Sequence, residues 1–310
     1  MTAAKRKPLS AARKREIIKT WVPMYLMLTP FLVLFTVFTL VPILGAALLS
    51  LTDFNGLVFP NIVWFENFSR LFLRDEVFLI SLRNTLLLAM IMGPTTIILS
   101  FLVAWLIREL TPYVRMVIII LMYLPALSGI AAFTNIMRYI FAADTHGLIN
   151  SFLIRTGILS SPINWVGDPA WTMTTVVIVS IWASFGIGFL AFVAGLSNLD
   201  RSYYEAAAVD GLKNRWQELY YVTLPQMGPQ LLFAAVTSIG GAFTVHLINI
   251  EMTGNPSVNY STNTIVMHMM ELGSVRFEMG YAAAISVVLF ALMQVTWSLT
   301  KRMLARFSGE

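Results

Sequence analysis

Apolar residues occupy most of this chain, in stretches too long for the core of a soluble domain. Six segments reach or exceed the length of about 20 apolar residues that a helix needs to cross a bilayer. They are residues 24–51, 84–107, 114–141, 172–195, 231–252 and 281–303. The third contains Pro125, which a membrane helix tolerates when neighbouring helices satisfy the freed backbone groups. The pattern predicts an all-α membrane protein with about six transmembrane helices.

Basic residues are distributed unevenly between the segments that join these spans. Lys and Arg are enriched on the cytoplasmic side of membrane proteins. With the N-terminus inside, fifteen of the 21 basic residues fall in inner segments and five in outer loops. The basic N-terminal segment 1–23 is followed by an apolar run longer than the about 7–15 residues of a cleaved signal peptide. We therefore expect cytoplasmic N- and C-termini and one transmembrane domain, residues 24–310, with residues 200–230 in the cytoplasm.

The composition agrees with a membrane protein and excludes several chemistries. Hydrophobic residues make up 57% of the chain and charged residues 12%, against roughly 25% charged residues in a soluble domain. Cysteine is absent, so disulfides and thiolate sites are excluded. His146, His246 and His268 lack the HExxH spacing of a zinc hydrolase, and no G-x-x-x-x-G-K-[ST] phosphate loop is present. We expect no catalytic residue, no metal site, no directly bound cofactor and no nucleic-acid partner.

Residues 200–230 form a charged segment between two apolar spans. Ser202 and Glu205 have the spacing of a capping box, which predicts a helix start, and Gly211 can end that helix in the left-handed conformation. A second helix is predicted to follow and to stop at Pro225. The segment is either a well-capped connector or a docking surface for another protein. Its length of about thirty residues, against about 2–8 for common helix connections, favours docking.

Residues of this segment resemble the EAA signature of the permease subunits of ABC importers. The signature reads E-A-A, D-G, then L-P and a later proline. The matching residues are Glu205, Ala206, Ala207, Asp210, Gly211, Leu224, Pro225 and Pro229. We call residues 200–230 the EAA segment.

Other stretches resemble the carbohydrate-uptake branch of that family, which includes maltose, lactose and glycerol-phosphate permeases. Examples are LRNTLLL at 82–88 and FEMGYAAAISVVLF at 277–290, and the likeness covers nearly the whole chain. The chain departs from the family at Thr253-Gly254-Asn255-Pro256, where TGGGP is common. The turn chemistry is preserved, because Asn tolerates positive φ.

The resemblance implies the type I ABC importer permease fold, in the bacterial cytoplasmic (inner) membrane, and a carbohydrate-type solute. The chain would pair with a second permease subunit as a heterodimer, surrounded by membrane lipid. Two copies of a cytoplasmic ABC ATPase, which use ATP and Mg, would bind the EAA segment. An extracytoplasmic solute-binding protein would deliver the solute. Closure of the ATPase dimer would switch the spans between inward-open and outward-open forms.

The resemblance also places solute contacts in the fourth and fifth spans. Trp182 lies mid-span although tryptophan is usually interfacial, and a sugar face stacked on its indole would explain that position. In the alternative interpretation, the small residues allow helix packing and Trp182 fills a gap. The candidates are Trp182, Ser184 and Gly186 in the fourth span and Thr237, Gly241 and Thr244 in the fifth.

Three other classes of protein are less consistent with the sequence. A proton- or sodium-coupled transporter usually needs ionisable residues within its spans, and Glu251 is the only acid near a span interior. An intramembrane enzyme would need a GxSG, GxGD or HExxH site, and none is present. A purely structural subunit remains possible if the EAA-like residues match by coincidence. Co-purification of an ATPase would separate these classes from an importer subunit.

Overall fold

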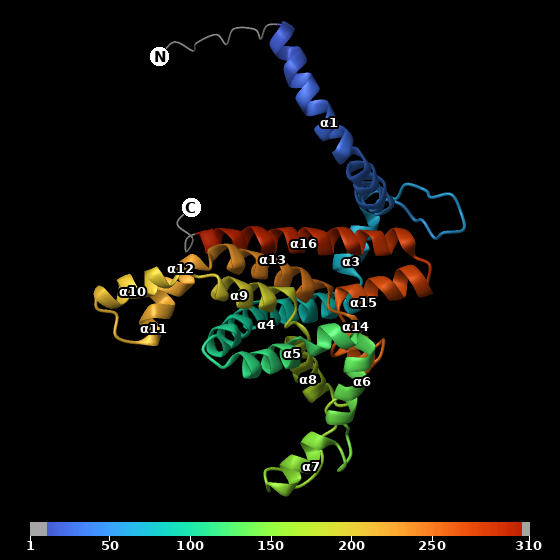
Figure 1. Cartoon of the computed structure of the whole chain (residues 1–310). Coiled ribbons are helices and arrows are strands. Elements are labelled where there is room, and N and C mark those ends of the chain that lie inside the picture. Colours follow the sequence, from blue (N-terminus) through green and yellow to red (C-terminus); the bar gives the residue numbers. More distant parts are fainter. Residues whose placement is uncertain (1–10, 306–310) are drawn as a thin grey trace.

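The computed structural model describes residues 11–305, which form a bundle of helices joined by loops (Figure 1). Within this range an isolated β-bridge joins Thr52 and Ile62. In chain order the elements are α1 Ala11–Phe35, the π-turn η1 Thr36–Leu40, α2 Val41–Leu49, α3 Glu66–Leu73, α4 Glu76–Ile107, α5 Pro112–Ser128, α6 Ile130–Ile140, α7 Leu148–Arg155, α8 Pro169–Ala183, α9 Ile187–Ser197, α10 Arg201–Val209, α11 Arg215–Glu218, the π-turn η2 Leu219–Thr223, α12 Leu224–Gln226, α13 Gly228–Thr244, α14 Leu247–Thr253, the 3₁₀-turn η3 Val258–Tyr260, α15 Ile265–Met270, the π-turn η4 Glu271–Val275 and α16 Met279–Ala305.

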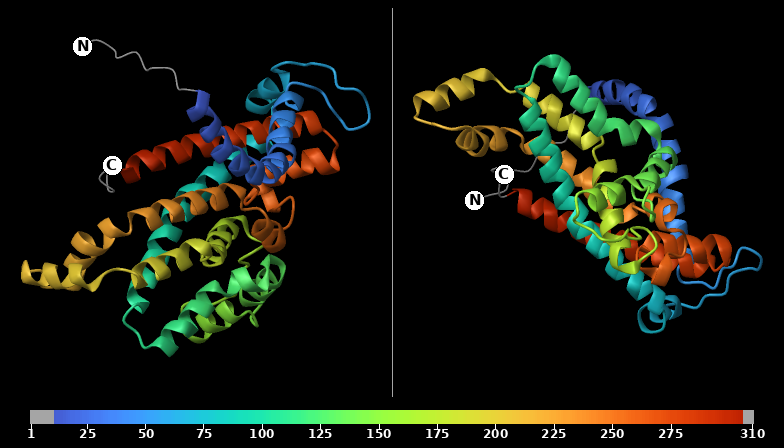
Figure 2. Two further views of the ribbon diagram at one scale, coloured as in Figure 1. Left: turned by 45° about the horizontal axis from the view of Figure 1, so that its top comes forward. Right: turned by 90° about the horizontal axis from the view of Figure 1, so that it is seen from below.

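Helices α4 and α13 pack against each other in the middle of the bundle (Figures 1 and 2). The buried apolar side chains form three clusters, and α4 contributes Phe78 to the first, Leu88 to the second and Phe101 to the third. Helix α13 also contributes to all three clusters. Because burial of apolar surface is the main stabilising term, these two helices hold the different parts of the bundle together.

In the first span, α1 projects away from the bundle, whereas α2 packs against α16 (Figure 1). The apolar stretch of this span, Trp21–Leu49, is 29 residues long, and the most apolar part has no buried residue. Helix α1 already begins at Ala11 and so crosses the predicted boundary between segment 1–23 and the first span. The first ten residues of that basic segment lie outside the described residues. An uncovered apolar helix of this length is typical of one that contacts lipid or another subunit.

Three of the predicted spans are single helices, and the other three are broken. The continuous ones are Trp21–Leu49, Glu76–Ile107 and Met279–Arg302. The broken ones are α5 with α6, bent by 112°, α8 with α9, bent by 44°, and α13 with α14, bent by 42°. Counting each bent pair as one span gives up to six in the described residues, as predicted. The third span breaks at Gly129, where φ is +77°, and continues as a helix through Pro125.

A polar stretch that the span prediction leaves in an outer loop is buried in the structure. Asn263 is fully buried. The side-chain amide of Asn84 in α4 donates hydrogen bonds to the carbonyls of Tyr260 and Asn263, at 2.9 and 3.0 Å. The backbone N–H of Ile265 donates to the hydroxyl of Thr85 at 2.9 Å. These bonds attach the start of α15 to α4, so residues 257–275 are part of the packed bundle.

Candidate functional site

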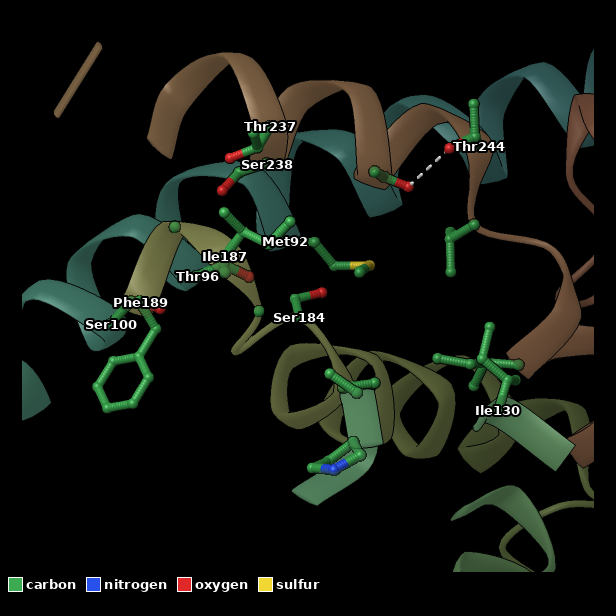
Figure 3. A pocket seen from close by; sticks show the side chains of 18 of the residues that line it. Met92, Thr96, Ser100, Ile130, Ser184, Ile187, Phe189, Thr237, Ser238 and Thr244 are labelled. Atoms are coloured by element: carbon green, nitrogen blue, oxygen red, sulfur yellow. Dashed lines mark hydrogen bonds between the residues drawn. The ribbon is translucent and has the colours of Figure 1, made fainter. Parts of the chain in front are cut away.

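The breaks in the three bent spans converge on one cavity of about 540 Å³. Gly129, Gly186, Val245 and His246, the residues at the breaks, all line it. Figure 3 shows side chains from α4, α9 and α13 around this space. A helix break leaves backbone N–H and C=O groups without intrahelical partners. At membrane depth such groups are tolerated where they are buried in protein or line a water-filled cavity.

The walls of the cavity carry hydroxyl groups and apolar side chains. Among the described lining residues none is Asp, Glu, Lys or Arg, and His246 is the only ionisable one. Ser184 and Thr244 satisfy their hydroxyls within their own helices, on the carbonyls of Ser180 at 2.7 Å and Gly240 at 2.8 Å. The cavity therefore presents neutral hydrogen-bonding groups beside apolar surface.

Two hydroxyls of α4 differ from the others. Thr96 and Ser100 line the cavity and are only 4% and 2% exposed. Neither hydroxyl has a hydrogen-bond partner among the described residues. A buried polar group without a partner is costly and calls for an explanation such as a bound water or ligand. Their spacing of four residues on one helix face was a signal available in the sequence, but the prediction did not use it.

The structure brings five of the six predicted solute-path residues together at this cavity: Ser184, Gly186, Thr237, Gly241 and Thr244. The sixth, Trp182, is not among the lining residues. Its ring packs edge-on against Phe133, with 5.5 Å between the ring centroids, and Phe133 faces the cavity. In this structure the partly buried Trp182 therefore packs against the wall of the cavity through Phe133.

The EAA segment begins with α10, but its cap differs from the predicted one. The side chain of Asp200 accepts a hydrogen bond from the backbone N–H of Ser202 at 2.9 Å. Asp200 is therefore the N-cap, and the predicted capping box of Ser202 and Glu205 is wrong because the helix starts two residues earlier. The hydrogen bonds from Ser202 lower the pKa of Asp200 below its ordinary value. A carboxylate at this position also interacts favourably with the helix dipole.

Gly211 ends α10 in the predicted left-handed conformation, with φ at +93°. The N–H of Leu212 donates to the carbonyl of Ala207 at 3.1 Å, and the N–H of Gly211 donates to that of Ala208 at 3.2 Å. This pair of bonds is the Schellman motif. Around the EAA residues, Glu205 and Ala206 are exposed and Ala207 is buried, so α10 presents an open face to its surroundings.

The second helix of the EAA segment does not stop at Pro225. Asn214 caps α11, and the helix continues through the π-turn η2 into α12, which contains Pro225 in its first turn. Pro225 directly follows the π-helical turn η2, and the wider i→i+5 spacing of that turn lets the helical path pass the proline. The prediction that Pro225 halts the helix is therefore wrong. The helical path is interrupted two residues later, at Met227, and Pro229 lies in the first turn of α13.

Known proteins provide an independent comparison for this arrangement. The family model described as binding-protein-dependent transport system inner membrane component matches residues 96–307. A lactose transport system permease protein of Rhizobium radiobacter is 30% identical, over 87% of this chain and 90% of that protein. An arabinooligosaccharides transport system permease protein of Bacillus subtilis is also 30% identical, over 92% of this chain and 90% of that protein.

A solved structure shares the fold. It is a chain of a bacterial alginate ABC transporter in complex with an alginate pentasaccharide-bound periplasmic protein. It superimposes with a TM-score of 0.76 at 22% identity, over 94% of this chain and 97% of that chain. The family match, the sequence relatives and the fold agree over most of the chain's length. The protein therefore belongs to the family of binding-protein-dependent transport system inner membrane components.

Proposed function

We propose that this chain is the permease subunit of an ATP-driven importer for a neutral, carbohydrate-type solute. The observation that carries the proposal is the cavity at which three broken spans meet. Its hydroxyls suit a solute rich in hydroxyls, and the absence of Asp, Glu, Lys and Arg among its described lining residues favours a neutral one. The functions for which two relatives are named, lactose transport and arabinooligosaccharide transport, support the same class of solute.

The chain is a transport subunit, and the hydrolysis of ATP is assigned to a separate ATPase. We assign the exposed face of α10 and the Gly211 turn to contact with that ATPase, two copies of which would serve this chain and a second permease subunit. An extracytoplasmic solute-binding protein would deliver the solute, as suggested by the periplasmic protein in the alginate transporter complex. The membrane is the bacterial cytoplasmic membrane, in agreement with the family's description.

The proposal is tested by ATP-dependent uptake of radiolabelled neutral sugars and oligosaccharides into proteoliposomes that contain the complete complex. In this assay Thr96→Val is expected to weaken the apparent affinity for the solute by about two- to tenfold, the effect of one hydrogen bond. The substitution keeps the shape of the side chain. Since the Thr96 hydroxyl has no partner among the described residues, no internal hydrogen bond is lost.

Thr95→Val is the matched control, because Thr95 is the adjacent residue of α4 and does not line the cavity. It is expected to leave the apparent affinity unchanged. Equal affinities for wild type and both variants would contradict the assignment of the cavity to the solute. If the wild-type complex took up no neutral carbohydrate, that result would contradict the proposed function itself.

The orientation of the chain in the membrane is a separate prediction. The chain has no cysteine, so single cysteines report without background from this subunit. Ser160→Cys, in the exposed loop after α7, is expected to react with a membrane-impermeant thiol reagent added outside intact cells. Lys213→Cys, exposed in the EAA segment, is expected to react only after permeabilisation. The opposite pattern would place the EAA segment outside and reverse the predicted topology.

A further inference from the structure

Helix α10 makes few contacts with the body of the protein. Of its nine residues only Ala207 is buried, and Tyr204 is partly buried. At one end the short link Asn198–Asp200 joins it to α9, and at the other end the Gly211 turn leads to α11. A helix held in this way can shift when a partner pulls on it. Its shift reaches other helices through the two connections and through any side chain that contacts them.

Tyr204 is the side chain of α10 that makes such a contact. Arg108 Nη1 donates a hydrogen bond to its hydroxyl at 2.8 Å, and the same hydroxyl lies 2.9 Å from Oγ1 of Thr223. The guanidinium carbon of Arg108 also lies 4.7 Å from the centre of the Tyr204 ring. Thr223 is fully buried, so the hydroxyl of Tyr204 is anchored in the interior of the protein.

The partners of this hydroxyl belong to two other elements. Arg108 caps the C-terminus of α4, and Thr223 ends the π-turn η2. Helix α4 carries Thr96 and Ser100, the two cavity hydroxyls without a partner. One phenol group therefore connects α10 to the helix that lines the cavity and to the turn that leads into α13.

Other contacts between the EAA segment and the C-terminal end of α4 come from residues after α10. The buried ones are apolar, because Leu219 belongs to the same core cluster as Ile107. Arg215 forms an ion pair with Glu109, and their side chains are 58% and 53% exposed. The ring of Trp105 also contacts the exposed ring of Trp216, tilted by 42° with 5.4 Å between the centroids. Exposed ion pairs contribute little because water screens them and mobile side chains must be ordered. Within α10, the contact of Tyr204 is partly buried and is held from two sides, by Arg108 and Thr223.

We propose that the Tyr204 hydroxyl is a positioning group that transmits movement of α10 to α4 and so links the ATPase to the cavity. This inference rests on the proposed function, because it needs a partner that moves α10. Tyr204 touches neither solute nor nucleotide in this scheme. Without its hydroxyl, α10 would still bind the ATPase through its exposed face, but its shift would reach α4 only indirectly, through its two chain connections and the packing of Ala207.

The test uses the complete complex and a reporter cysteine, Ser184→Cys, in the wall of the cavity. The labelling rate of this subunit by a thiol reagent is measured without nucleotide and with ATP plus vanadate. With Tyr204 present, nucleotide is expected to change the rate. With Tyr204→Phe the nucleotide-dependent change is expected to fall by about fivefold or more, in the range of allosteric couplings, while the amount of co-purified ATPase stays constant.

Two controls separate transmission from general damage. Tyr139→Phe removes the same group from an exposed side chain of α6 and is expected to keep the full response. Thr223→Ser keeps a hydroxyl for Tyr204 and is expected to retain most of the response. Thr223→Val removes one of the two partners but leaves Arg108 in place, so it is expected to lower the response less than Tyr204→Phe does.

A full nucleotide response in Tyr204→Phe would overturn the inference. Loss of the bound ATPase in that variant would also overturn it, because the hydroxyl would then only hold the EAA segment in shape. A wild-type cavity whose labelling ignores nucleotide would contradict the proposed function and the inference together. If only the inference failed, the wild-type labelling would still respond to nucleotide, and the contradicting result would come from the Tyr204→Phe variant alone.

Discussion

Replacing Gly211 by valine is expected to lower ATP-driven uptake by about tenfold or more, while the chain still inserts into the membrane. Gly211 has a φ of +93°, a conformation that costs a residue with a side chain about 1–2 kcal/mol and is an outlier for a β-branched one. The substitution therefore distorts the turn between α10 and α11. It also places a branched side chain on the surface that we assign to the ATPase.

Gly157→Val is the matched control for the backbone effect. Gly157 also has a positive φ, +74°, and in both glycines an added Cβ would meet no described atom within 4 Å. The two substitutions therefore cost the folded chain a similar backbone strain, but Gly157 lies in the loop after α7, far along the chain from the EAA segment. We expect the Gly157 variant to retain uptake and bound ATPase.

The measurements are uptake in proteoliposomes, solute-stimulated ATP hydrolysis and pull-down of the ATPase. Lower uptake in the Gly211 variant with less bound ATPase would support contact at the turn. Equal defects in both valine variants would assign the effect to backbone strain alone. Normal uptake and normal ATPase binding in the Gly211 variant would leave the EAA segment as a connector.

The sequence predicts well those features that depend only on a segment's own residues. Every span must hold about 20 apolar residues whatever its neighbours are, so the span count follows from composition along the chain. The positions of the breaks in the three bent spans do not follow from composition. Gly129 and Gly186 lie at breaks, whereas Gly93 and Gly240 lie within continuous helices. A glycine permits a break, but the packing of neighbouring helices decides whether one forms.

The two errors in the EAA segment have a similar origin. Asp200 and Ser202 are both good N-cap residues, and the Ser-x-x-Glu spacing pointed to the wrong one. The backbone decides, because Asp200 has the extended conformation of an N-cap, with φ −69° and ψ 128°. The helix end was placed at Pro225 because no sequence pattern predicted the π-turn η2, through which the helix continues past this proline. The buried position of Asn263 depends on Asn84, a partner 179 residues away, and no local pattern contains that information.

The candidate cavity was predicted in part. The stripe of Thr237, Gly241 and Thr244 lines it because residues at these spacings share one helix face. Trp182 was chosen because a mid-span tryptophan is unusual, but the direction of its ring depends on Phe133 in another helix. The spacing along one helix thus identified a face that lines the cavity, whereas the surroundings of Trp182 depend on a different span, which no local pattern contains.

The second large effect is expected at the opposite end of α4, where Asp75 accepts three hydrogen bonds. They come from the backbone N–H of Phe78 at 2.8 Å, from His268 Nε2 at 2.8 Å and from the Tyr281 hydroxyl at 2.7 Å. Asp75 thus caps α4 and joins it to α15 and α16. Asp75→Ala is expected to lower the free energy of unfolding by about 3–5 kcal/mol, from the lost cap and two polar groups left without this partner.

Asp75→Asn is the matched variant, because Asn caps helices as well as Asp does and keeps one acceptor oxygen. It is expected to lose clearly less stability than Asp75→Ala. The measurement is thermal or denaturant unfolding of the purified complex in detergent, followed by circular dichroism. Equal losses in both variants would contradict the role of the cap, and no loss in either would contradict the hydrogen-bonded cluster as a whole.

The charge of Asp75 adds a dependence on pH whose sign follows from the hydrogen bonds. Burial by itself raises the pKa of Asp75, but the bonds from His268, Phe78 and Tyr281 outweigh it and lower the pKa from 3.8 to about 2. A carboxyl whose pKa is lower in the folded chain stabilises that chain above the unfolded pKa and loses this contribution as the pH falls through the folded one. The stability difference between wild type and Asp75→Asn is therefore expected to be constant near neutral pH and to shrink as the pH falls from about 4 towards 2. A difference that stayed constant over that range would show that the ionised carboxylate stabilises the fold no more than a neutral amide, and the cluster would then act through its shape alone.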